Sequence, residues 1–133
     1  MLALILGSAL ASTTIQVESM TVDGQEVREL ECELEKGGLF AAAAVVGALA
    51  KQKGTLDACM PSGGAARVAW VWAAGSVKSA SVSQVSDDRH KACVTEALRG
   101  MGAPMGGSCK ALLLIGPAAA AKEAAERLAP ATE

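Results

Sequence analysis

The fold is decided by a short apolar stretch, residues 67–73, which reads RVAWVWA. Val68, Trp70 and Trp72 fall on one side of an extended chain, and the residues between them fall on the other. β-Branched and aromatic residues at this spacing are typical of a strand with a buried face. Residues 77–85 (VKSASVSQV) continue the alternation after a glycine-containing turn. Together the two segments predict an antiparallel hairpin.

A second hairpin is predicted nearer the amino terminus. Residues 19–22 and 27–34 are strand-like runs separated by Asp23-Gly24, a dipeptide that favours tight hairpin turns. In the second run two leucines and a cysteine share one face, while glutamates occupy the other. Strict alternation places Val27 with the glutamates. One solvent-exposed face and one buried face indicate an antiparallel sheet that is covered on a single side.

The remaining segments predict three helices and a fifth strand. The first helical segment is Ala-rich and apolar almost all round, which favours a core helix over the alternative of a helix lying on a membrane surface. The second follows Ser86 or Asp87, either of which can cap a helix. The helices are expected at residues 39–59, 88–101 and 117–128, and the strand at residues 108–115. The predicted fold is therefore α+β, an antiparallel sheet with helices packed on one face, in the order β-β-α-β-β-α-β-α.

Length and composition limit the function classes. The chain has 133 residues and a net charge of −2, which fits one domain and does not favour a nucleic-acid partner. The longest apolar run after the amino terminus covers residues 39–50, whereas a membrane-spanning helix needs about 20 residues. We therefore expect a single domain over residues 12–128, a frayed tail at 129–133 and no stable membrane insertion.

The first eleven residues, MLALILGSALA, are typical of a signal segment. They end in Ala9-Leu10-Ala11, which fits the preference for small residues before a cleavage site. No Lys or Arg precedes the apolar run, so the segment is either a truncated signal or simply an apolar first strand. The first of these interpretations predicts a periplasmic or secreted protein.

Four cysteines support export. None belongs to a Cys-x-x-Cys pair, so the spacing is not that of a zinc ribbon or a thioredoxin-type redox site. Wide, even spacing is typical of structural disulfides in an oxidising compartment. The alternative is four buried free thiols in a cytosolic protein. The cysteines are Cys32, Cys59, Cys93 and Cys109, and four cysteines permit three connectivities.

The middle of the chain resembles the carboxy-terminal domain of TonB-type energy transducers, and most closely its gliding-motility relatives of the AgmX/PglI type. The resemblance rests on Leu56-Asp57-Ala58-Cys59, the hairpin RVAWVWAAGSVKSASVSQVS and the helix DDRHKACVTEALRGM, and it covers residues 39–115. It implies that Cys59 and Cys93 bond two helices together. Cys32 and Cys109 are additional to the cysteines of that family. They lie on two strands with a buried face, and we expect them to join each other.

The candidate site is a surface for a partner. Trp70 and Trp72 share a strand face, where they either fill the core or anchor a partner. Three alternating serines mark the polar side or edge of the same hairpin, where a partner strand can add. The candidate partner-binding residues are Trp70, Trp72, Ser79, Ser81 and Ser83.

These observations predict a non-enzymatic protein-interaction module of the cell envelope, which binds a protein or peptide by strand addition and needs no cofactor or metal. The alternative is a thiol-dependent or metal-dependent enzyme that uses Cys93 and His90, which are three residues apart on one helix. The sequence favours a solvent-facing His90. It predicts no particular oligomeric state.

Overall fold

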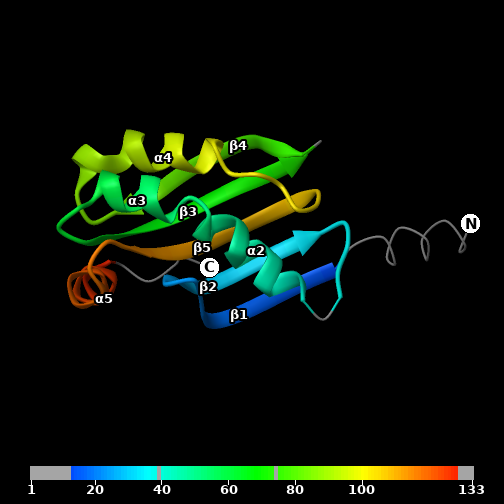
Figure 1. Ribbon diagram of the computed structural model, residues 1–133, viewed down its shortest axis with the longest axis horizontal. Helices are drawn as coiled ribbons and strands as arrows, with labels where there is room; N and C mark the ends of the chain where they lie inside the picture. The colour runs from blue at the N-terminus through cyan, green and yellow to red at the C-terminus, as the bar shows by residue number, and fades with distance from the viewer. Residues whose placement is uncertain (1–12, 39, 74, 129–133) are drawn as a thin grey trace, which may run out of the picture.

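The computed structural model describes residues 13–38, 40–73 and 75–128. Its five strands form one antiparallel sheet in the order β1-β2-β5-β3-β4 (Figure 1). The last strand in the chain is therefore central, between the two predicted hairpins, and β1 and β4 are the outer strands. The strands are β1 (Thr13–Val22), β2 (Gln25–Leu34), β3 (Gly64–Ala73), β4 (Ser76–Val85) and β5 (Gly107–Ile115).

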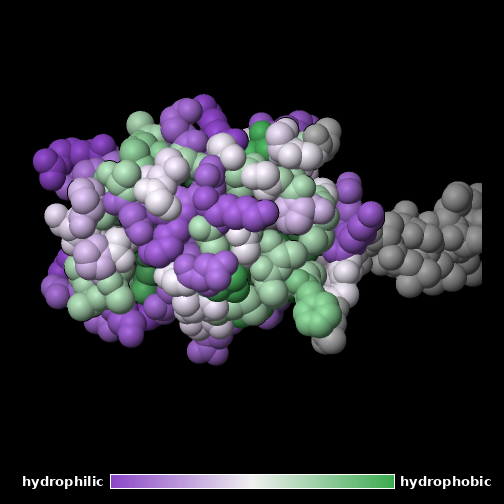
Figure 2. Space-filling model, viewed as in Figure 1, coloured by the Kyte–Doolittle hydropathy of each residue, from purple (hydrophilic) through white to green (hydrophobic). Residues whose placement is uncertain are grey.

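Three helices cover one face of this sheet, which we call the inner face. Between them and the strands lies the main core, which contains valines, leucines, alanines and both tryptophans. The three are α2 (Ala41–Ala50), α3 (Lys53–Cys59) and α4 (Lys91–Arg99), with the short 3₁₀ helix η1 (Asp88–His90) leading into α4. On the surface of this face, apolar side chains gather over α2 (Figure 2).

The last helix, α5 (Ala118–Arg127), lies on the opposite, outer face of the sheet. Its buried alanines pack on Ala65, Leu112 and Leu114, whose side chains alternate with those of the main core. The α+β class, the antiparallel sheet and the element order are confirmed. The expectation of helices on one face holds for α2, α3 and α4 but not for α5. The reason is that both faces of β5 are apolar at its carboxyl end, so each needs a cover.

The first hairpin turns where the sequence predicts. Asp23 and Gly24 both have positive φ, 49° and 83°, which is the geometry of a two-residue hairpin turn. The first strand is longer than expected, since β1 begins at Thr13 rather than at Ser19. The predicted signal segment at residues 1–11 and the predicted tail at residues 129–133 lie outside the described residues.

The predicted helix at residues 39–59 is two helices. The backbone leaves α2 at Lys51 and enters α3 after Gln52. At this break Gln52 Nε2 donates a hydrogen bond to the carbonyl oxygen of Ala97 on α4, at 2.9 Å. The change of direction brings α3 against α4. None of the helices in the described ranges is both long and apolar enough to cross a membrane.

The structure contains both expected disulfides. Cys59 at the end of α3 bonds Cys93 on α4, with Cα atoms 5.6 Å apart, so this bridge joins two helices. Cys32 on β2 bonds Cys109, its direct neighbour on β5, with Cα atoms 4.1 Å apart. The second bridge thus ties the leading hairpin to the centre of the sheet.

Candidate functional site

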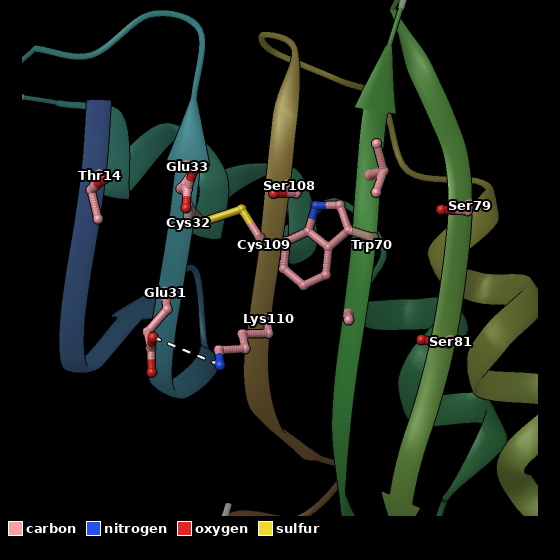
Figure 3. A pocket seen from close by; sticks show the side chains of 12 residues that line it. Thr14, Glu31, Cys32, Glu33, Trp70, Ser79, Ser81, Ser108, Cys109 and Lys110 are labelled. Carbon is pink, nitrogen blue, oxygen red and sulfur yellow. Dashed lines mark ion pairs between the residues drawn. A yellow bond between two sulfur atoms is a disulfide. The ribbon is translucent and has the colours of Figure 1, made fainter. Parts of the chain in front are cut away.

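Within the described part of the chain, α5 covers only one end of the outer face of the sheet, and the rest of that face forms a shallow groove. The groove has a volume of about 470 Å³ and crosses all five strands (Figure 3). Ala69 and Val71 of β3 provide small apolar side chains in its middle, and Val71 is 36% exposed. The lining residues are Thr14, Glu31, Cys32, Glu33, Ala69, Trp70, Val71, Ser79, Ser81, Ser108, Cys109 and Lys110, and of these Cys32, Trp70 and Cys109 have side chains buried in the main core.

Of the two roles predicted for Trp70 and Trp72, filling the core or anchoring a partner, the structure shows the first. Trp70 and Trp72 point to the inner face, where they are only 1% and 2% exposed. Their rings meet edge to face with centroids 5.6 Å apart. This corrects their assignment as partner-binding residues. Because most core side chains are small, these two rings fill space that the rest of the chain cannot.

Hydroxyl groups line the β4 side of the groove. Ser79 and Ser81 are exposed there and lie directly opposite Val71 and Ala69 of β3. Ser83 is not among the lining residues, because the register between β3 and β4 shifts beside it and its Oγ donates to the carbonyl oxygen of Arg67. The groove therefore contains two of the three predicted serines.

Carboxylates line the β2 side. Glu31 and Glu33 point to the outer face, and Lys110 of β5 lies between them and the small residues of β3 (Figure 3). Lys110 Nζ is 3.9 Å from Glu31 Oε1. Both groups are about half exposed or more, so this ion pair contributes little to stability and can rearrange around a ligand. An extended main chain laid in the groove would meet hydrogen-bond acceptors on one side and hydroxyl groups on the other.

The groove borders an outer strand at each end. Among the described residues β4 pairs with β3 on one side, and on the other side only its first residue, Ser76, forms a bridge, to Gly102. Beyond this bridge, alternate N–H and C=O groups of β4 point away from the sheet. Ser79 and Ser81 thus lie both on a free edge and in the groove. This combination can extend the sheet with a strand from a partner while the partner's side chains reach the outer face.

Cys93 and His90, the residues of the enzyme alternative, do not form a thiol–imidazole pair. Cys93 is bonded to Cys59 and so has no thiol in this state. His90 is about one third exposed, and its Nε2 lies 3.8 Å from Asp87 Oδ2. Asp87 itself caps η1, since its carboxylate accepts a hydrogen bond from the backbone N–H of Arg89. The predicted cap at Ser86 or Asp87 is therefore Asp87.

Comparisons with family models, with curated proteins and with solved structures found no match to this chain.

The predicted site does not include the charged residues that line the groove on and beside β2, which are Glu31, Glu33 and Lys110. The alternation of the leading hairpin places its glutamates on the solvent-exposed face, which is correct for Glu29, Glu31 and Glu33. Sequence pattern alone does not show that β5 pairs with both β2 and β3. Only this order brings the glutamates and Lys110 beside the serines of a hairpin that is distant in the sequence.

Proposed function

We propose that this chain is an exported, non-enzymatic interaction domain of the cell envelope that binds an extended segment of a protein partner by strand addition at β4. Two disulfides fit an oxidising compartment such as the periplasm or the exterior. The resemblance to TonB carboxy-terminal domains of the gliding-motility type, with its helix-to-helix disulfide, agrees with this proposal.

One observation carries the proposal: β4 is an outer strand whose exposed serines also line the groove. Main-chain hydrogen bonds to β4 would provide affinity, and the groove would select side chains. Ser79 to Val82 is the stretch of β4 that pairs regularly with β3, because the register shifts on either side of it. A partner strand would therefore dock against this stretch.

Peptides selected from a displayed random library against the full chain test the proposal. We expect a selected peptide to shift the backbone amide NMR signals of Ser79 to Val82 and of Val71. Ser81→Lys should lower the affinity for the peptide about tenfold, which corresponds to a loss of roughly 1.4 kcal/mol of binding free energy. Ser62→Lys makes the same change at an exposed position outside the groove and should leave binding unchanged.

Failure to select any peptide, or signal changes confined to the helices or to β1, would overturn binding at β4.

A further inference from the structure

The other outer strand, β1, has few of the features that usually protect a sheet edge. Natural edges are blunted by lysine, proline, bulges or short length. β4 has Lys78 and two register shifts. β1 is ten residues long and contains no lysine, arginine or proline, and its only charge is Glu18. Most of its residues are β-branched, which favours strands: Thr13, Thr14, Ile15, Val17, Thr21 and Val22.

The apolar side chains of β1 are incompletely covered. They pack at the rim of the main core, beneath α2, yet all four remain partly exposed. A further strand alongside β1 would cover them. The four are Ile15, Val17, Met20 and Val22.

When Glu18 is left out, the order of inner-face and outer-face residues in β1 is symmetric about Val17. Inner-face residues are at odd positions up to Val17 and at even positions from Met20 onward, so the alternation shifts at Glu18. Glu18 is the one residue of β1 from Thr13 to Val22 that has no partner in the register with β2, and its opposite position is Glu29, where φ is 54°. With Glu18 left out, the strand presents the same order of inner and outer side chains in both directions.

Hydrogen-bonding direction follows the same order. Val22 and Gln25 flank a two-residue turn, so they exchange hydrogen bonds across the hairpin. Along a strand, residues on the opposite face direct their N–H and C=O groups to the opposite side. The outer-face residues of β1 therefore direct these groups away from β2, toward the edge at which no described strand pairs. They are Thr14, Gln16, Ser19 and Thr21.

We propose that two copies of this chain associate through β1, antiparallel and two-fold symmetric, so that their sheets become continuous. Val17 lies opposite Val17 of the second copy, and Glu18 is left unpaired in each. In every other pair, both residues lie on the same face of the sheet: Thr13 with Val22, Thr14 with Thr21, Ile15 with Met20, and Gln16 with Ser19. Because one strand supplies both sides of this interface, a second copy is the partner that fits it. The β4 strand of each copy remains an outer strand of the continuous sheet, so peptide binding at β4 does not depend on this association.

Two variants with the same lysine test this register. Thr14→Lys with Thr21→Lys places like charges opposite each other in both symmetric pairs, whereas Thr14→Lys with Thr21→Glu places opposite charges there. Sedimentation equilibrium of the full chain should show a dimer. We expect its dissociation constant to be about tenfold or more higher in the first variant than in the second. Ser79→Lys with Ser81→Lys, on the other edge, should leave it unchanged.

Three results would overturn the proposal, provided that circular dichroism shows each protein folded. The first is an unsubstituted chain that stays monomeric throughout the concentration series. The second is one dissociation constant shared by both β1 variants. The third is dissociation caused by the β4 substitutions alone. As an independent readout, the amide protons of Ser19 and Thr21 should exchange more slowly with solvent as the protein concentration rises.

Discussion

At the scale of single residues, the backbone of Glu29 controls which side chains of β2 are buried. Its φ of 54° lies in the left-handed region, which residues with a side chain adopt at a cost of about 1–2 kcal/mol. The register between β2 and β5 shifts beside it, which is a β-bulge. As a result Val27 lies on the inner face with Leu30, although strict alternation places it with the glutamates.

We therefore expect Glu29→Gly to be more stable than Glu29→Ala by about 1 kcal/mol. Both substitutions remove the ion pair that Glu29 makes with Arg67 at 2.7 Å, so their difference reports the backbone alone. The free energy of unfolding, from urea denaturation, measures it. At Glu31, in the extended part of the same strand, the order should reverse, with glycine about 0.5–1 kcal/mol less stable than alanine. The same order at both positions would contradict the strained backbone.

At the scale of elements, the start of the η1–α4 segment depends on one carboxylate. Hydrogen bonds from the side chain and from the backbone N–H of Arg89 hold the pKa of Asp87 well below its ordinary value. A carboxyl group whose pKa is lowered by folding stabilises the folded state above its unfolded pKa, about 3.9. This contribution is lost as the pH falls toward the folded pKa.

Asp87→Ala should accordingly lower the midpoint of thermal unfolding by a small amount at neutral pH, and the difference from the unsubstituted chain should narrow below about pH 4. Asp87→Asn retains an oxygen that can cap the helix but does not titrate. The difference between the asparagine and alanine variants should therefore stay constant with pH. A gap between the unsubstituted chain and Asp87→Ala that is unchanged at low pH would show that the carboxylate charge plays no part.

Local pattern predicts most of the elements and little of their arrangement. Alternation and the Asp23-Gly24 turn predict both hairpins, because these signals involve residues that are close in sequence. The break at Gln52 depends on a carbonyl group of α4, 45 residues away, and no local signal shows it. For the same reason the serines of the groove are predictable, whereas their position across from Glu31 and Lys110 is not. That position follows from the insertion of β5 between the hairpins.

At the scale of the whole molecule, the two disulfides hold together segments that the small core side chains pack only weakly. The Cys59–Cys93 loop lies entirely within the Cys32–Cys109 loop, and the two span 34 and 77 positions. One bridge fixes the helical layer and the other fixes the junction of the leading hairpin with the rest of the sheet. Alanine has little apolar area to bury, so restricting the unfolded chain is an effective way to stabilise such a fold.

The loop-entropy relation predicts that each bridge contributes about 4 kcal/mol to the free energy of unfolding, with slightly more from the longer loop. The double substitutions Cys59→Ala/Cys93→Ala and Cys32→Ala/Cys109→Ala should each lower it by about that amount, as measured by urea denaturation. In the unsubstituted protein, denaturation without reductant should expose no thiol to alkylation, and reduction should expose all four, as intact mass would show. Alkylation without reductant at Cys93 would instead support the thiol-enzyme alternative, and it would remove the reason to assign this chain to an oxidising compartment.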